Sequence, residues 1–416
     1  MNLYEKIVIT GIGAITAAGN TNELWNAITE QKNCLSVFES KEIKNLPAKV
    51  VGRVTKDISS KLPKKILPFC SRHTLLAASA LYECIENANI NSFSQNVNGL
   101  IFGSTSLGQD MMKNSYKQLF NKAFDEANYN ILNTISNAGA AQILSSLINL
   151  NGFVQGVEAA SCSGLLTLIN GANLIKSGIC ERVFCVVGEA NLFPATILYY
   201  SRKVRMSGIS YSFFGKVSNA DERASNDYVI PFGHPQLSDR GAIAEAGAVI
   251  LLESEKAALK RNARIHAEFE QYHFSFHADN FHGTDNQQLG LNRVMEIYKS
   301  LQFDSAYLPI TGCYPMDVAT YKVCGKYYPN MHAFSAEAVI GHTGATTALI
   351  NTILAIKSIE NKMLLPTKNY LPNSKDTLCS LSPETEIKPF DKIKRLLIIS
   401  TGFGGYNGSC SIKKYG

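Results

Sequence analysis

The chain has 416 residues and a formal net charge of +6, and 45% of its residues are hydrophobic while 18% are charged. This composition is ordinary for a globular protein, and the length indicates two core-forming halves. The positive charge is small and forms no basic stripe with interleaved aromatic residues, so we expect no nucleic-acid binding. No apolar run reaches the roughly 20 residues that a membrane span needs.

The cysteines and the first residues predict a cytoplasmic protein. Residues 1–19 read as an apolar strand and a glycine turn without a basic leader, so we expect no signal peptide. Ten cysteines are scattered along the chain without a CxxC pair, which argues against a zinc site. A chain with this cysteine pattern and no secretion signal fits a reducing compartment.

Strands and helices alternate in the first part of the chain. Strands are expected at 6–16, 98–106, 153–160 and 182–190, and helices at 23–32, 73–90, 135–150 and 164–178. Continuous apolar strands are typical of a sheet covered on both faces, so the strand before residue 161 is expected to be buried. Gly178 suits the C-terminal cap of the last of these helices.

The second part of the chain repeats this succession. Strands are expected at 264–276 and 307–313, helices at 289–301 and within 337–363, and a hairpin-like pair at 394–415. We therefore predict an α/β protein of two related halves, 1–253 and 254–416, with helices between and outside the sheets. Residues 191–235 are irregular and are expected to form surface loops near the site.

The stretch VEAASCSGLL, residues 157–166, carries the candidate site. It reads as a strand that turns sharply into a helix through small residues, and such a turn often presents a nucleophile. Ser161 and Cys162 lie side by side on it. A serine hydroxyl is a poor nucleophile unless a base lies beside it, so the neighbours of this turn decide its chemistry.

Four stretches together resemble the β-ketoacyl-acyl carrier protein synthases of the thiolase-like superfamily. Their order and spacing span nearly the whole chain. The resemblance implies a thiolase-like fold with helix–sheet–helix–sheet–helix layers. It also implies decarboxylative condensation, in which a cysteine thiolate accepts an acyl chain while two histidines and a lysine act around the malonyl thioester. The stretches are IVITGIGAIT (7–16), AASCSG (159–164), IPFGHPQLSDRGAIAEAGAVILLE (230–253), and VIGHTGATTALI (339–350) followed by GFGGYNG (402–408).

The nucleophile position departs from the family pattern. The family turn reads Ala-Cys-x-x-Gly, and anchoring on Gly164 places Ser161 at the cysteine position. Cys162 falls one residue later, which on a helix is a rotation of about 100° and a rise of about 1.5 Å. We therefore do not expect Cys162 to point where the acyl carbon would lie.

Other positions that match catalytic residues of the family also differ. Thr311 takes the place of the first histidine, and Glu337 takes the place of the lysine. The second histidine is retained as His342, and Thr401 replaces a phenylalanine before GFGG. The resemblance implies that this set, Ser161, Thr311, Glu337 and His342, has lost condensing activity.

A ketosynthase scaffold that lacks these residues resembles the chain length factor, the ketosynthase-β subunit of bacterial type II polyketide synthases. The best-known members carry glutamine at the nucleophile position, where this chain has serine. The resemblance implies a heterodimer with an active ketosynthase, no bound cofactor, and a partner acyl carrier protein whose phosphopantetheine arm acts in the complex. The inactive subunit then shapes the tunnel for the growing polyketide chain.

Residues 104–120 correspond to the family segment at that shared interface. Apolar side chains that block a tunnel limit chain length, because each buried methylene is worth about 0.8 kcal/mol and a packed core resists compression. The candidates for lining the tunnel are Leu107, Met111, Met112 and Tyr116. An ordinary core or interface helix explains the same pattern.

Two other functions stay open at this point. Ser161 as nucleophile, His342 as base and Glu337 as the group that orients the imidazole are the residue types of an acyl-transfer or thioester-cleaving enzyme. A structural salt bridge formed by Glu337 is the competing interpretation. If the turn is shifted by one residue, Cys162 becomes the nucleophile of an active ketosynthase. His277 and His282 have no ligand cluster at metal-binding spacing and are expected to lie in loops.

Overall fold

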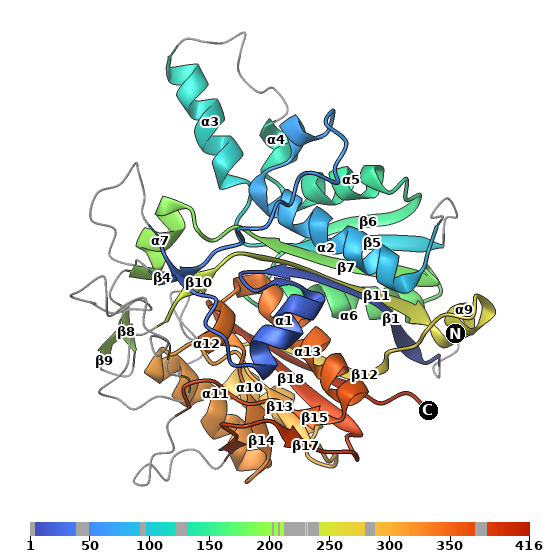
Figure 1. Ribbon diagram of the computed structural model, residues 1–416, viewed down its shortest axis with the longest axis vertical. Helices are drawn as coiled ribbons and strands as arrows, with labels where there is room; N and C mark the ends of the chain where they lie inside the picture. Colours follow the sequence, from blue (N-terminus) through green and yellow to red (C-terminus); the bar gives the residue numbers. More distant parts are fainter. Residues whose placement is uncertain are drawn as a thin grey trace.

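The computed structural model describes residues 5–38, 50–91, 97–121, 131–201, 204–206, 209–211, 229, 231, 241–278, 288–370 and 381–416. Twelve of the described strands form one mixed sheet, to which each half of the chain contributes a five-stranded unit (Figure 1). The other two strands of this sheet are β2 (Gly19–Asn20) and β16 (Ser382–Pro383), and each adds to one of the units.

The unit of the first half has the spatial order β6-β5-β7-β11-β1. β6 and β7 pair in parallel with β5, whereas β11 pairs antiparallel with both β7 and β1. If the five strands are numbered 1 to 5 by their order in the chain, their order across the sheet is therefore 3-2-4-5-1. Their bounds are β1 (Ile7–Thr16), β5 (Asn98–Gly103), β6 (Gly152–Val157), β7 (Arg182–Glu189) and β11 (Ala246–Ser254).

The unit of the second half repeats this order and these strand directions as β14-β13-β18-β19-β12. An antiparallel contact between β1 and β12 joins the two units. The predicted fold of two related α/β halves is thus confirmed, while the boundary at residues 253 and 254 stays a prediction. The strand bounds are β12 (Ala267–Phe276), β13 (Ser305–Tyr307), β14 (His332–Phe334), β18 (Arg395–Gly402) and β19 (Tyr406–Lys413).

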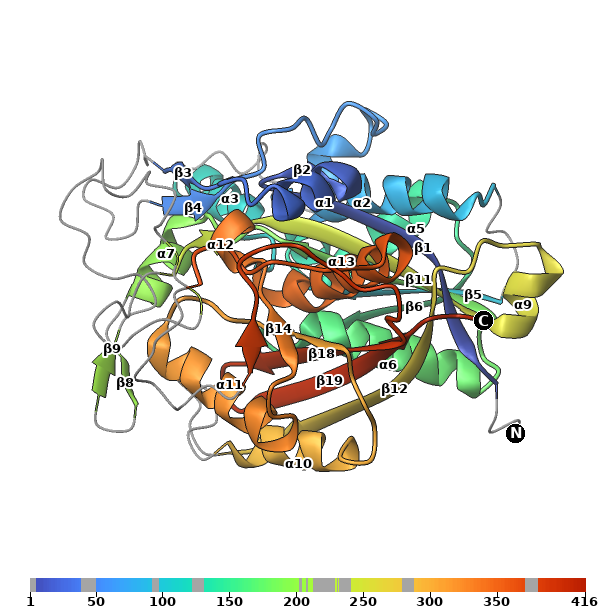
Figure 2. The same cartoon turned by 60° about the horizontal axis from the view of Figure 1, so that its bottom comes forward.

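Helices complete five layers around the two units. Two helices lie between the units and contact each other as well as strands of both halves (Figures 1 and 2). These are α6 (Ser163–Lys176) and α13 (Thr347–Asn361). The outer face of the first unit is covered by α2 (Arg72–Ala88) and α5 (Asn137–Leu147), and that of the second by α10 (Leu289–Ile297) and α11 (Tyr314–Tyr327).

Small residues allow the two central helices to approach each other closely. A Cβ added at Gly164 of α6 would lie 2.2 Å from the carbonyl oxygen of Ala345, which is in η4 (Gly344–Thr346), the turn that leads into α13. Gly178 has a φ of +73° just after α6 and supplies the left-handed cap that the sequence predicted. The loops that begin these two central helices therefore face each other, and both carry candidate site residues.

The remaining described elements are short or lie at the rim. Residues 191–235 are not wholly irregular, because they begin with the helix α7 and the hairpin β8–β9, and most of the rest lies outside the described residues. These elements are α1 (Thr21–Thr29), β3 (Ser36–Val37), β4 (Val50–Gly52), η1 (Leu67–Phe69), α3 (Gln109–Phe120), α4 (Ile131–Thr134), α7 (Pro194–Ser201), β8 (Val204–Met206), β9 (Ile209–Tyr211), β10 (Ile243–Ala244), α9 (Glu255–Lys260), α12 (Glu337–Ile340), β15 (Met363–Leu364) and β17 (Lys388–Pro389).

The expected hairpin at the C-terminal end is confirmed as β18–β19, but the expectation of a buried strand before the turn is wrong. Among the described strands, β6 pairs with β5 alone and forms the edge of the sheet. Most of its residues are exposed or half-buried, and Val154 is 37% exposed. Its apolar residues suggested a covered strand, but a strand is covered only if other elements of the chain pack on it.

Candidate functional site

The turn between β6 and α6 is held in a tight conformation by its own residues. Ala160 has a left-handed φ of +48°. The hydroxyl of Ser163 donates a hydrogen bond to the Ala160 carbonyl at 2.6 Å and accepts one from the Ala159 amide at 2.8 Å. Ser161 lies between these anchors, directly before the N-cap residue Cys162, and it borders two cavities.

Cys162 is fully buried and borders neither of these cavities. Its thiol donates to the Tyr406 carbonyl at 3.6 Å and accepts from the Ser400 hydroxyl at 3.4 Å, so it points toward β18 and β19. Burial raises the pKa of the Cys162 thiol to about 12. A thiol with this pKa is almost entirely protonated at neutral pH and is a weak nucleophile.

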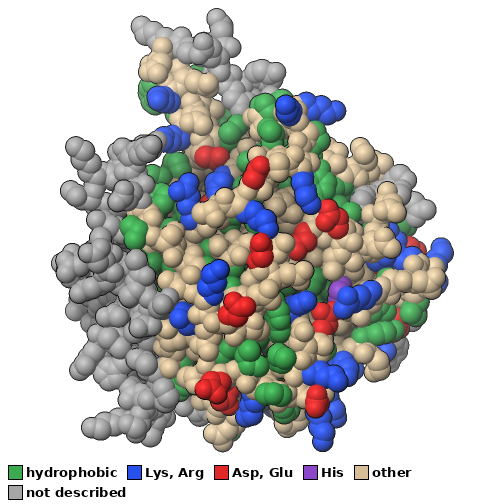
Figure 3. Space-filling view, viewed as in Figure 1, with side chains coloured by type: hydrophobic (Ala, Val, Ile, Leu, Met, Phe, Trp, Pro, Cys, Tyr) green, Lys and Arg blue, Asp and Glu red, His purple; other side chains and the backbone are tan. Residues whose placement is uncertain are grey.

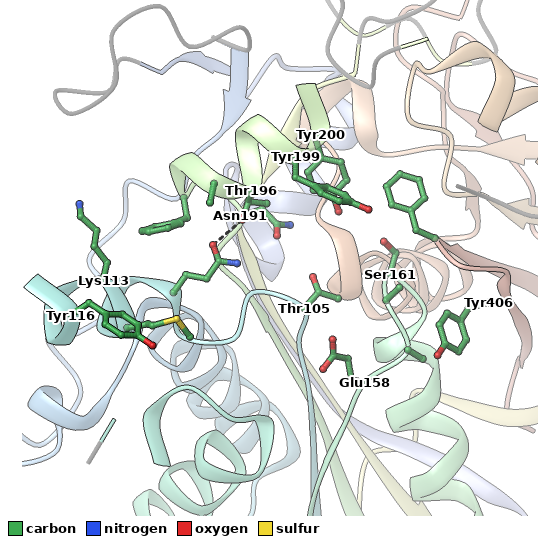
Figure 4. Close-up of a pocket in the computed structure, with 17 residues that line it drawn as sticks. Thr105, Lys113, Tyr116, Glu158, Ser161, Asn191, Thr196, Tyr199, Tyr200 and Tyr406 are labelled. Carbon is green, nitrogen blue, oxygen red and sulfur yellow. Dashed lines mark hydrogen bonds between the residues drawn. The ribbon is translucent and has the colours of Figure 1, made fainter. Parts of the chain in front are cut away.

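The larger of the two cavities has a volume of about 860 Å³ and extends from Ser161 to α3 (Figure 4). Hydroxyl, amide and charged groups line it together with aromatic rings, and Figure 4 shows Lys113 and Tyr116 at the side opposite Ser161 and Tyr406. The lining residues are Thr105, Gln109, Met112, Lys113, Tyr116, Glu158, Ala159, Ala160, Ser161, Asn191, Phe193, Ala195, Thr196, Tyr199, Tyr200, Phe403 and Tyr406.

Two of the four residues proposed for the tunnel line this cavity. Met112 and Tyr116 are four residues apart on α3 and so share one face of the helix. Met111 lies about 100° around the helix from Met112 and is not among the lining residues. Leu107 precedes α3 in a left-handed conformation, φ +44°, and does not line the cavity either.

The smaller cavity, of about 10 Å³, brings together three of the positions that the sequence resemblance predicted to match catalytic residues of the family. Ser161, Thr311 and His342 border it, and they come from three separate parts of the chain. A volume of this size is about the minimum that holds one water molecule. The other lining residues are Tyr200, Pro309, Met316, Thr401 and Phe403.

Thr311 is held by a buried carboxylate on α11. Its hydroxyl donates to Asp317 Oδ1 at 3.1 Å and accepts from the Cys313 amide at 3.1 Å. Asp317 also accepts the Thr311 and Gly312 amides, at 2.8 and 2.9 Å, although burial raises the pKa of this carboxyl group well above its ordinary value. Thr311 therefore has neither the imidazole nor the available proton that a histidine would offer there.

His342 and Glu337 form a buried pair. His342 Nδ1 lies 2.9 Å from Glu337 Oε1, and the two residues are 6% and 3% exposed. Burial lowers the pKa of His342, but the raising effect of the Glu337 and Glu189 carboxylates is larger, so the pKa lies above its ordinary value of 6.5. The second oxygen, Glu337 Oε2, has no hydrogen-bond partner among the described residues.

An aromatic cluster that the sequence did not reveal borders both cavities. Tyr200 from α7 and Phe403 from the turn between β18 and β19 have ring centroids 5.9 Å apart, and Tyr199 stacks edge-on against Tyr200 at 5.4 Å. Tyr200 and Phe403 line the large and the small cavity alike. No local pattern predicts this contact, because its partners are about 200 residues apart.

Comparison with known proteins agrees with this arrangement. The model of the β-ketoacyl synthase N-terminal domain matches residues 4–258. The 3-oxoacyl-[acyl-carrier-protein] synthase 2 of Synechocystis is 23% identical over 444 residues, covering 100% of this chain and 99% of that protein. A β-ketoacyl synthase structure from Burkholderia phymatum has a TM-score of 0.86 at 19% identity, and the ishigamide ketosynthase/chain length factor has 0.83 at 17%; each covers 99% of this chain and 100% of the other.

The two α/β units, the turn at Ser161 and the family match define a thiolase-like ketosynthase scaffold. The chain belongs to the β-ketoacyl synthase family.

Two expectations about metals and membranes concern only the part of the chain that the structure describes. No group of three His, Cys, Asp or Glu side chains there could hold a metal ion. No helix there is long and apolar enough to cross a membrane. His277 follows β12 as expected for a loop residue, and His282 lies outside the described residues.

Proposed function

We propose that this chain is a non-catalytic, chain length factor-like subunit that pairs with an active ketosynthase. The observation that carries the proposal is the turn at residues 159–164. In this turn, Ser161 lines both cavities, whereas Cys162 is fully buried and lines neither. Condensation on this scaffold needs an ionised nucleophile at position 161, and the hydroxyl of a serine does not ionise at neutral pH.

The groups around Ser161 support the same conclusion. Decarboxylative condensation needs hydrogen-bond donors at the developing enolate. Thr311 already donates its proton to Asp317, and Glu337 brings a carboxylate where the family has a lysine. Replacing one histidine donor and one positive charge weakens the stabilisation of a negatively charged intermediate. A role in shaping the chain made by another subunit remains compatible with these residues.

Two exposed features offer a surface for a partner ketosynthase. β6 is the edge strand of the sheet, and the unpaired side of such a strand is a template for pairing with another chain. α3 projects from the body of the molecule (Figure 1), with Tyr116 53% and Phe120 84% exposed. A continuous hydrophobic interface of this kind would explain why the scaffold is kept without its condensing residues.

The partner's substrate would be a malonyl group on an acyl carrier protein, and the growing polyketide would enter the cavity between Ser161 and α3. The carrier protein's phosphopantetheine arm would act in the complex, and this chain would need no bound cofactor. The cysteines that the structure describes are all free, which fits the cytoplasm as the compartment we propose.

Product length should depend on the side chain at position 112. We expect Met112→Trp to fill the α3 end of the cavity and to exclude about one two-carbon unit. Losing burial of two methylenes costs about 1.6 kcal/mol, so the ratio of longer to shorter products should fall at least tenfold. The measurement is mass spectrometry of products made by the heterodimer with a candidate active ketosynthase and an acyl carrier protein.

Met111→Trp is the matched control because Met111 neighbours Met112 on α3 but does not line the cavity. It should leave the product ratio unchanged, provided that size-exclusion chromatography shows an intact heterodimer. The proposal fails if this chain forms no complex with any such ketosynthase, or if it extends acyl chains by itself.

A further inference from the structure

A buried pair that borders the small cavity through His342 is not explained by condensation. Glu337 accepts the Nδ1 proton of His342 at 2.9 Å, and both side chains are buried. A carboxylate that accepts a hydrogen bond from Nδ1 keeps the proton on that nitrogen, so Nε2 is the basic nitrogen of the imidazole. Shaping a tunnel does not require a buried imidazole–carboxylate pair, so the alternatives are a structural salt bridge and a catalytic role.

Ser161 completes the set. It borders the same cavity as His342, and because that cavity is about 10 Å³, one water molecule there would touch both residues. Ser161 also borders the large cavity, where an acyl chain could lie. It sits at the N-terminus of α6, a helix of 14 residues whose partial positive charge favours a developing oxyanion.

We propose that Ser161, His342 and Glu337 form a catalytic triad that hydrolyses acyl thioesters of the phosphopantetheine type. The substrate class is a carrier-bound acyl chain, and the reaction does not require a malonyl carboxylate. This activity goes beyond the proposed subunit role and does not need the partner ketosynthase. Either idea can therefore fail while the other stands.

The reaction has two balanced steps. In the first, Ser161 Oγ attacks the thioester carbonyl, His342 Nε2 takes the hydroxyl proton, the C–S bond breaks, and His342 returns the proton to the leaving thiolate. In the second, His342 takes a proton from water, the water oxygen attacks the acyl-serine ester, and the C–Oγ bond breaks. Ser161 regains its proton, and the products are a free thiol and a carboxylic acid.

The small cavity is suited to the water of the second step. Three hydroxyl-bearing residues, Ser161, Thr311 and Thr401, border it together with His342, so a water molecule there has polar residues around it. Tyr200 and Phe403 line this cavity and also the large one. An acyl chain in the large cavity would therefore leave the water position beside His342 unfilled.

The rate should rise with pH, because His342 must be neutral to accept a proton. Burial lowers the pKa of His342, and the neighbouring carboxylates raise it to a value above 6.5. The rising limb should therefore have its midpoint above pH 6.5. The titratable groups around His342 are Glu337 on α12, Glu189 on β7, Tyr200 on α7 and, beside Glu337, Asp317 on α11.

The test uses the full-length protein with hexanoyl-pantetheine thioester, which has no carboxylate to lose. Mass spectrometry of the digested protein should detect a hexanoyl adduct on the peptide that contains Ser161, and hexanoic acid should be released. Ser161→Ala should abolish the adduct and lower acid release at least about a hundredfold. Cys162→Ala should retain both signals, because that thiol borders neither cavity.

Glu337→Gln distinguishes a catalytic triad from a structural salt bridge. It should keep the hydrogen bond to the imidazole but remove the charge that raises the pKa of His342, so the midpoint of the pH–rate profile should fall by at least about one unit. A profile that does not move, or acid release that survives in folded Ser161→Ala, would overturn the proposal. A change in product length in the Met112→Trp heterodimer would not bear on it.

Discussion

Exchanging Ser161 for cysteine should produce a thiol that iodoacetamide alkylates roughly a thousandfold faster than the native Cys162. At pH 8, a thiol of pKa about 12 is ionised in about one molecule in ten thousand, whereas an ordinary thiol of pKa about 8.5 is ionised in about a quarter. Position 161 also borders the large cavity and precedes the N-terminus of α6, which favours the thiolate. The measurement is the alkylation rate at each residue by tandem mass spectrometry of the peptide.

Ser161→Ala is the control, since it has no thiol at position 161 and leaves Cys162 in place. It should react at that peptide as slowly as the native protein. Fast alkylation of Cys162 in the native protein would contradict the geometry of the turn. It would also revive the interpretation of an active ketosynthase that uses Cys162.

The second large effect concerns the close approach of α6 and the loop before α13. Gly164→Ala should destabilise the protein by about 1–3 kcal/mol, because the added Cβ would lie 2.2 Å from the backbone oxygen of Ala345 and 3.0 Å from Leu349 Cδ1. A backbone carbonyl cannot turn aside as a flexible side chain can, so the two central elements must separate. The midpoint of urea unfolding measures this loss.

Separation of these elements should also disturb the site, since Ser161 lies three residues before Gly164 and His342 three residues before Ala345. Asn170→Ala, a half-buried position on the same helix, is the control and should change stability by no more than about 0.5 kcal/mol. Equal unfolding midpoints for Gly164→Ala and the native protein would mean that Gly164 and the Ala345 carbonyl lie farther apart than in this structure.

Most of the strands and helices in the two halves could be predicted from the sequence, although β11, β14 and α11 were not among those expected. Each half repeats apolar strands and amphipathic helices of the lengths that an α/β unit needs, and the units have the same strand order. The exposure of β6 could not be predicted in this way. A strand's own residues show that it is apolar, but whether a second strand or a helix covers it depends on elements distant in the chain.

For the candidate site too, some features could be predicted from the sequence and others depended on the tertiary structure. The amino-acid sequence by itself predicted that Ser161 matches the family's nucleophile position, because its spacing to Gly164 depends only on neighbouring residues. It also supplied Glu337 and His342, five residues apart. Only the tertiary structure decided that these two side chains form a hydrogen bond, that Ser161 and His342 share a cavity, and that Met112 rather than Met111 lines the larger one. Such contacts depend on helix orientation and on packing between residues far apart in the chain, which a local pattern does not contain.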